Sequence, residues 1–187
     1  MSTASPAMVS APMVMVLMGV SSSGKSTIGL RLAQLLGWPF RDADSFHPPA
    51  NIAKMSRGIP LEDSDRWPWL DAIAAWIDAQ LQQGQSGLVS CSALKRSYRR
   101  RLVRDRTDVR LVYLQGSFEL VSERMLRRRD HFMPVSLLHN QFEVLEEPAA
   151  DENALVVSIA QPAERVVETI IAELGLASVS QTPNSQR

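Results

Sequence analysis

A phosphate-loop pattern, G-x-x-x-x-G-K-[ST], is matched at every fixed position by Gly19-Val20-Ser21-Ser22-Ser23-Gly24-Lys25-Ser26. In such a loop, backbone N–H groups and the positive end of the following helix converge on one point, which suits the β-phosphate of a nucleotide. We expect Lys25 to reach the β- and γ-phosphates and the Ser26 hydroxyl to bind Mg²⁺. The pattern therefore predicts a site for Mg·ATP that continues into Thr27.

Two aspartates, Asp42 and Asp44, end a short predicted strand that starts at Trp38. Ligands of an open parallel sheet bind outside the carboxyl ends of its strands, and i, i+2 spacing points both side chains the same way. Phosphoryl transfer needs a carboxylate near the metal and often a base at the acceptor hydroxyl. No other predicted strand end carries an acid, so we predict that these two residues supply both groups. The alternative is a pair of solvated loop aspartates.

Cationic side chains gather at residues 95–106 and 124–129, although the formal net charge of the chain is zero. Lys95 and Arg99 share one helix face near a strand end. We interpret the remaining arginines of that stretch as a solvated helix face: Arg96, Arg100, Arg101, Arg104 and Arg106. The second stretch, before Pro134, indicates a helical hairpin that can close over ATP and bring an arginine to the transferring phosphoryl group. A solvated cationic hairpin is the alternative.

Five short apolar segments alternate with helical patterns, which predicts an α/β domain with a parallel sheet. The predicted strands cover residues 13–18, 38–44, 87–91, 109–114 and 154–159. The predicted helices cover residues 27–36, 51–55, about 64–83, 96–102, 118 onward, 136–145 and 163–174.

The longest of these helices is expected to be capped by Asp63 or Ser64 and to end near Gln83. Its apolar residues recur at steps of three and four, which predicts one buried face made by Leu70, Ile73, Ile77 and Leu81. Three tryptophans of the same segment are interpreted as packing residues: Trp67, Trp69 and Trp76.

The bulk composition describes one globular domain. The chain has 187 residues, of which 45% are hydrophobic and 21% are charged. The balanced charge gives no reason to expect a nucleic-acid partner, and no apolar run approaches the ~18–20 residues of a membrane helix. The single cysteine, Cys91, indicates a reducing compartment and a buried core position. No basic residue precedes Lys25, and the apolar segment before it leads directly into the phosphate loop, so we expect no signal peptide.

Several further groups follow the loop in order across residues 13–172. They are Asp42-Ala43-Asp44…His47-Pro48, Asn51-Ile52-Ala53-Lys54-Met55, Arg66…Pro68-Trp69-Leu70, Cys91-Ser92-Ala93-Leu94-Lys95…Tyr98-Arg99, Arg124…Arg128, His131-Phe132, Gln141-Phe142 and Gln161-Pro162. In these groups the chain resembles the bacterial gluconokinases, P-loop small-molecule kinases related in fold to shikimate and nucleoside-monophosphate kinases. The chain departs from the family pattern at three positions: Ser22, Ala43 and Asp130 replace residues that are usually glycine or small.

The resemblance implies phosphorylation of D-gluconate by ATP, with Mg²⁺, to give 6-phospho-D-gluconate and ADP. It implies a three-layer P-loop kinase fold with a five-stranded parallel sheet in the order 2-3-1-4-5 and a helical lid. It also implies a cytoplasmic homodimer in a sugar-acid route to the pentose phosphate or Entner–Doudoroff pathways. We expect one domain over residues 12–175, with a substrate-binding insert at about 45–70, a lid at about 124–140, and flexible tails at 1–11 and 176–187.

Residue roles follow from the same resemblance together with the chemistry above. The predicted catalytic residues are Lys25, Asp44 and Arg128. The predicted nucleotide site adds Arg124, Arg128, Gln161 and Pro162 to the phosphate loop and Thr27. The predicted acceptor site is made by Asp44, His47, Lys54, Arg66, Lys95, Arg99 and His131. Ser26 and Asp42 are the predicted metal ligands.

Two other functions remain open on the sequence alone. One is a kinase of the same fold that acts on shikimate, adenylylsulfate or a nucleoside monophosphate. The other is a nucleotide switch without an acceptor, although the chain lacks the N-K-x-D guanine motif and contains an acceptor-side insert.

Overall fold

The computed structural model describes residues 11–127 and 135–177. The strands are β1 (Val14–Met18), β2 (Phe40–Asp42), β3 (Gly87–Ser90), β4 (Val109–Gln115) and β5 (Leu155–Ser158). The α-helices are α1 (Lys25–Leu36), α2 (Pro49–Ser56), α3 (Asp63–Gln82), α4 (Arg96–Val103), α5 (Phe118–Arg127), α6 (Val135–Val144) and α7 (Ala163–Glu173). Two short 3₁₀ turns complete the order, η1 (Ala43–Phe46) and η2 (Ala150–Glu152).

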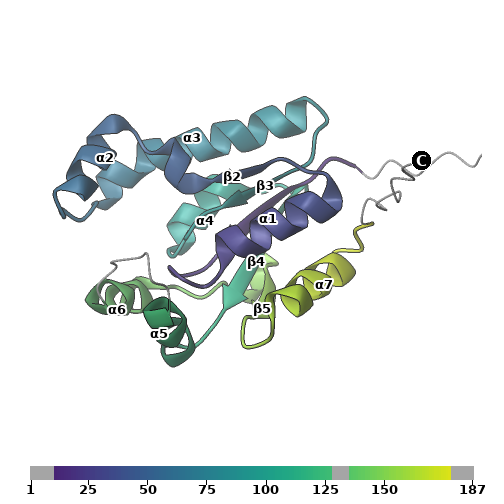
Figure 1. Cartoon of the computed structure of the whole chain (residues 1–187). Helices are drawn as coiled ribbons and strands as arrows, with labels where there is room; N and C mark the ends of the chain where they lie inside the picture. Colours follow the sequence, from purple (N-terminus) through teal and green to yellow (C-terminus); the bar gives the residue numbers. More distant parts are fainter. Residues whose placement is uncertain (1–10, 128–134, 178–187) are drawn as a thin grey trace, which may run out of the picture.

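The five strands form one parallel sheet in the order β2-β3-β1-β4-β5, which confirms the predicted fold (Figure 1). Val14 at the start of β1 pairs with Gly87 on one side and with Val109 on the other. All strands therefore end at the same edge of the sheet, where the loops after β1, β2 and β3 meet. The phosphate loop follows the central strand and lies in the middle of this edge.

Two apolar cores cover the two faces of the sheet, because side chains alternate along each strand. Met15 and Leu17 of β1 point into the core that α1, α5, α6 and α7 complete. Val14, Val16 and Met18 point into the other core, beneath α3 and α4. All five residues of β1 are fully buried, as expected for the central strand of a three-layer α/β domain.

The prediction of a single buried face on the long helix α3 is confirmed in part. Leu70, Ile73 and Ile77 are completely buried, whereas Leu81 only packs at the margin of the core. The predicted cap is wrong by one or two residues, because the helix begins at Asp63 and Glu62 is its N-cap. The Glu62 backbone N–H donates to the carboxylate of Asp65, 2.9 Å away, so an acid in the first turn supports the helix start.

The remaining helices frame the active edge. Figure 1 shows α2 beside one end of α3 at the top of the view and α5 beside α6 at the lower left. No helix in the part of the chain that the structure describes combines the length and apolar character needed to cross a membrane.

Candidate active site

The phosphate loop joins β1 to α1 and curls tightly over the end of the sheet. Gly19 has φ +149° and lies so close to its neighbours that a Cβ there would be 2.8 Å from Ser23 Oγ and 3.0 Å from the Leu114 carbonyl oxygen. Ser22 adopts φ +63°, a left-handed conformation that favours glycine. The departure at position 22 thus places a serine where the backbone would suit the usual glycine better.

Lys25 is the first residue of α1, and its ammonium lies back over the loop. The Nζ atom donates to the carbonyl oxygens of Gly19 and Val20, each at 2.9 Å. The hydroxyl of Ser23 is buried and has no hydrogen-bond partner among the described residues. An unsatisfied donor inside a loop of N–H groups fits an oxyanion such as a phosphate.

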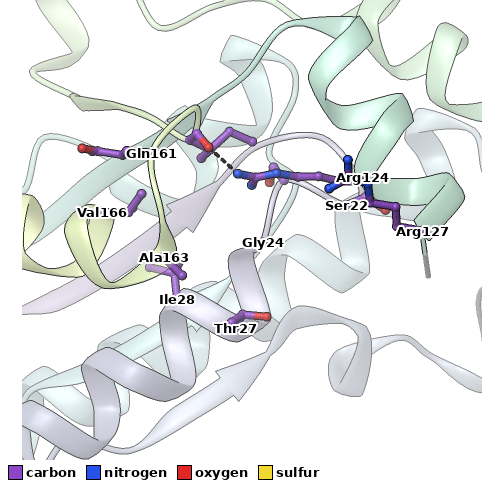
Figure 2. Close-up of a pocket in the computed structure, with 11 residues that line it drawn as sticks. Ser22, Gly24, Thr27, Ile28, Arg124, Arg127, Gln161, Ala163 and Val166 are labelled. Carbon is purple, nitrogen blue, oxygen red and sulfur yellow. Dashed lines mark hydrogen bonds between the residues drawn. The ribbon is translucent and has the colours of Figure 1, made fainter. Parts of the chain in front are cut away.

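A cavity of about 270 Å³ opens beside this loop. The loop and α1 contribute one wall, α5 contributes Arg124 and Arg127, and the segment after β5 contributes Gln161 (Figure 2). Arg124 extends across the cavity and donates to the Ile159 carbonyl oxygen. Of the residues predicted for the nucleotide, Arg124 and Gln161 line this cavity beside the phosphate loop, while Pro162 caps α7 and does not line it.

The predicted metal ligands are in direct contact. Ser26 Oγ donates to Asp42 Oδ2 at 2.9 Å, and the Asp44 backbone N–H donates to Asp42 Oδ1 at 3.1 Å. These groups line a smaller cavity of about 160 Å³ together with Lys25 and Asp44. Mg²⁺ binds one or two carboxylates together with phosphates and keeps several waters, so one hydroxyl and one or two carboxylates at the loop fit this ion.

His47 is held in place on the acceptor side of the same edge. Its ring stacks on Trp69 with centroids 4.5 Å apart and an angle of 9° between the planes. The Trp69 indole N–H in turn donates to the Ala43 carbonyl oxygen at 2.7 Å. Burial lowers the pKa of His47 below its usual 6.5, so the ring is neutral near pH 7. His47 Nδ1 faces the Asn51 amide at 3.3 Å, which leaves Nε2 directed toward Asp44 Oδ1 at 4.0 Å.

The predicted acceptor-side cations are already paired with aspartates. Lys54 Nζ contacts both carboxylate oxygens of Asp65 at 2.7 Å. Lys95 Nζ contacts both oxygens of Asp63 at 2.9 and 2.8 Å, and Arg66 lies 3.4 Å from the same carboxylate.

Asp63 is the centre of a cluster that the sequence did not reveal. Besides the two cations, the Tyr98 hydroxyl donates to its carboxylate, and Arg66 donates to the Tyr98 oxygen at 3.2 Å. The hydrogen bond from Lys95 holds the pKa of Asp63 below its usual value, and the same contact raises the pKa of Lys95. Acids at the active edge are expected at strand ends, whereas Asp63 begins a helix.

Arg99 does not face the acceptor side, which corrects its predicted role. Its side chain is only 1% exposed and forms a two-pronged ion pair with Glu152, at 2.6 and 2.8 Å. The remaining nitrogen donates to the carbonyl oxygens of Ala93, Leu94 and Glu146. The helical spacing from Lys95 is right, but α4 turns this residue inward, and all three of its side-chain nitrogens already donate to protein acceptors.

Gln141 is a second residue that the sequence analysis did not single out as functional. Its amide oxygen accepts the Ser21 backbone N–H at 2.7 Å and its amide nitrogen donates to the Ser21 hydroxyl at 2.9 Å. It therefore ties α6 to the phosphate loop. The predicted residues Arg128 and His131 lie outside the described part of the chain.

The comparisons with known proteins agree with this geometry. A family model described as shikimate kinase matches residues 21–174. A gluconokinase of Gluconobacter oxydans (strain 621H) is 44% identical over 160 residues, covering 86% of this chain and 90% of that protein. The thermosensitive gluconokinase of Escherichia coli (strain K12) is 47% identical over 141 residues, covering 75% of each chain.

Solved structures show the same likeness. A gluconokinase from Sinorhizobium meliloti 1021 superimposes with a TM-score of 0.79 at 46% identity, covering 88% of this chain and 92% of that one. A shikimate kinase from Aquifex aeolicus, at 20% identity and a TM-score of 0.54, shares the fold.

Proposed function

Because the chain belongs to the gluconokinase family, we propose that it transfers the γ-phosphoryl group of ATP to D-gluconate. The products are then ADP and 6-phospho-D-gluconate. The observation that carries the proposal is the single edge that holds an ATP-type phosphate loop, an exposed aspartate and a group of cations on the acceptor side. Gluconate is a carboxylate anion with several hydroxyls, so it needs both the cations and the polar groups found there.

On the donor side, we assign the phosphate loop and Lys25 to the β- and γ-phosphates. The Lys25 ammonium exchanges loop carbonyls for phosphate oxygens when the nucleotide binds. We assign Arg124 to the phosphates, from the α5 side, and Gln161 to the adenine end. Roles for Arg128 at the phosphates and for Pro162 beside the adenine stay predictions. Phosphoryl transfer depends on positioning and charge stabilisation more than on covalent chemistry, and these groups supply both.

Ser26 and Asp42 are the groups that would hold Mg²⁺. When bound, the ion neutralises charge on the β- and γ-phosphates. Asp42 also accepts the Asp44 backbone N–H and so fixes the turn that presents Asp44.

On the acceptor side, Asp44 is placed to accept a hydrogen bond from the 6-hydroxyl and to take its proton. Its side chain is 91% exposed at the active edge, so a substrate can reach it. Neutral His47 directs Nε2 toward the same position and can bind a neighbouring hydroxyl. Arg66, Lys54 and Lys95 are the cations proposed for the carboxylate, and the planar fork of Arg66 suits both carboxylate oxygens. His131 stays a predicted contact of the lid.

Three further proposals rest on the family resemblance. We propose a cytoplasmic location, a homodimer and a place in sugar-acid breakdown. The tryptophans of α3 do not argue for the dimer, because Trp69 is buried and Trp67 and Trp76 pack against the core.

The role of Asp44 is tested by Asp44→Asn in an assay that couples ADP release to oxidation of NADH. Removing a general base costs about 10²–10⁴ in rate, so turnover with gluconate should fall by that factor while the affinity for ATP stays nearly unchanged. Asp108→Asn makes the same chemical change at an exposed aspartate at the opposite edge of the sheet and should leave the rate unaffected. Turnover that survives Asp44→Asn removes Asp44 from the role of base.

The acceptor is tested on the unaltered protein by the same assay. We expect ADP release to rise with gluconate and not with shikimate, adenylylsulfate or nucleoside monophosphates. A rise with one of the latter keeps the ATP site and overturns the assignment of the acceptor cations. ATP hydrolysis that ignores all of them would favour a nucleotide switch.

A further inference from the structure

A second cleft, of about 340 Å³, lies away from the phosphate loop. It is bounded by α4, the turn that follows it, the amino end of β4 and the turn before β5. Six arginines line it, against three carboxylates, those of Asp105, Asp151 and Glu152. The six are Arg96, Arg99, Arg100, Arg104, Arg106 and Arg110. No step of the proposed reaction uses this cleft.

The three carboxylates of the cleft offset three of the six arginine charges, and two of the three form ion pairs with arginines of the cleft. Arg99 pairs with Glu152, and Arg96 pairs with Asp151. Arg96 also keeps a buried Nε atom that has no hydrogen-bond partner within the described residues. The expectation of a simple solvated helix face is therefore wrong for Arg96.

The other four arginines leave an excess of positive charge. Arg104 and Arg106 share the carboxylate of Asp78, which lies outside the cleft lining. Arg100 and Arg110 are exposed, and their side chains form no hydrogen bond or ion pair with any residue that the structure describes. Several guanidinium groups gathered without matching anions repel one another, so the cleft is electrostatically suited to a multiply charged anion.

The backbone of the cleft carries strain at the same place. Arg104 ends α4 with φ +54° and ψ −147°, a conformation that glycine adopts readily and other residues avoid. This conformation turns the chain sharply between α4 and β4 and keeps three of the arginines, at positions 104, 106 and 110, around one opening.

We infer that this cleft binds a small phosphorylated anion and that its occupancy is felt at the acceptor side of the active site. Guanidinium forks match phosphate oxygens in geometry and charge. The volume is at the lower end of the range for small-molecule sites and suits a phosphate ester of a few carbon atoms.

Arg99 provides the physical connection to the active site. Its guanidinium lines the cleft and donates to the carbonyl oxygens of Ala93 and Leu94, immediately before Lys95. It also donates to the carbonyl oxygen of Glu146, just beyond α6. An anion in the cleft attracts the Arg99 guanidinium and competes with Glu152 for it, and it therefore acts on the loop that positions Lys95.

Binding is tested by amide NMR on the full chain with glycerol 3-phosphate as the probe, at saturating ADP and about 0.15 M NaCl. ADP occupies the phosphate loop, so that shifts elsewhere report a separate site. We expect saturable shifts within residues 100–111 and 151–153, and none with glycerol, which lacks the phosphate. Shifts confined to the phosphate loop, or none that saturate, overturn the site.

Arg100→Ala combined with Arg110→Ala should weaken binding of the probe by about tenfold or more, since each removes a charge-assisted contact. Neither side chain forms a hydrogen bond or ion pair with a described residue, so we expect both substitutions to leave the fold intact. Arg101→Ala is the matched control, because Arg101 lies on the same helix but pairs with Asp71 outside the cleft. An equal loss of affinity in Arg101→Ala would reduce the site to general electrostatic attraction and overturn it.

The connection to the active site is tested by kinetics at saturating ATP, which rests on the proposed function, whereas the NMR titration does not. Glycerol 3-phosphate should change the KM for gluconate in the unaltered protein and not in the Arg100→Ala, Arg110→Ala variant. An unchanged KM at a concentration that saturates the NMR shifts overturns the connection through Arg99.

Discussion

Replacing Arg99 by methionine should destabilise the whole domain rather than weaken the binding of gluconate. The substitution keeps a long apolar side chain but removes the cation that pairs with Glu152, whose own side chain is only 10% exposed. It also leaves the carbonyl oxygens of Ala93, Leu94 and Glu146 without this donor. Breaking a buried ion pair from one side costs about 3–5 kcal/mol, because the remaining charge stays buried and unpaired.

The free energy of unfolding is measured by urea denaturation near pH 7, followed by tryptophan fluorescence. A slope of about 2–3 kcal/mol per molar urea, in the upper part of the range for single domains, converts the loss of about 3–5 kcal/mol into a midpoint lower by about 1–2.5 M. The hydrogen bond from Arg99 lowers the pKa of Glu152 in the folded protein, so this carboxylate stabilises the fold above its ordinary pKa of 4.5. That contribution is lost as the pH falls through the lowered value, so the difference between the two proteins should shrink in acid.

Two further variants show whether the loss of stability comes from the broken buried ion pair or simply from the loss of a positive charge. Arg101→Met removes an exposed arginine of the same helix and should leave the midpoint nearly unchanged. Combining Arg99→Met with Glu152→Met should recover part of the stability, because no buried charge then remains. An Arg99→Met protein that unfolds at the original midpoint but has a raised KM for gluconate would refute this reasoning and restore Arg99 to the acceptor site.

Two smaller predictions concern the phosphate loop and the strand beside it. Ser22→Gly should raise the free energy of unfolding by about 0.5–1 kcal/mol, because glycine relieves the left-handed conformation at φ +63°; a lower urea midpoint would contradict this. Cys91, the single cysteine, is fully buried, and burial raises its pKa to about 12, so the native protein should resist iodoacetamide near neutral pH, whereas the urea-unfolded chain should be alkylated. Rapid labelling of the native protein, detected by mass spectrometry, would show that β3 opens at this position.

The strands and helices could be predicted from the sequence because the local pattern of apolar residues matches the burial of each element in the fold. The run over residues 13–18 is apolar at every position, as a central strand requires, and β1 is buried at every position. The 3.6-residue period of α3 similarly identified Leu70, Ile73 and Ile77 as buried. The order of the strands does not follow from such patterns, which are silent on pairing, and it came from the family resemblance.

The site was predictable where chemistry depends on neighbours in sequence and less so where it depends on packing. The contact of Ser26 with Asp42 follows from a motif and a strand end that meet at one edge. The positions of Arg99 and Asp63 do not, because a helical period says which residues share a face but not which way that face points. Helix α4 turns Arg99 inward, and the start of α3 brings Asp63 to Lys95, from 32 positions away.

The pairing of the acceptor-side cations changes how binding of an acidic substrate should be understood. Lys95 and Arg66 already share the carboxylate of Asp63, and Lys54 pairs with Asp65. Each of these cations is therefore in an ion pair before the substrate binds. A substrate carboxylate must either share these cations with Asp63 or displace Asp63 from them. When it displaces Asp63, one carboxylate replaces another, so the net gain in binding free energy is small. The aspartates therefore fix the positions of the cations. This arrangement orients a bound substrate carboxylate but adds little to its affinity. Selectivity for a sugar acid then depends on the hydroxyls that His47 and Asp44 meet as well as on charge.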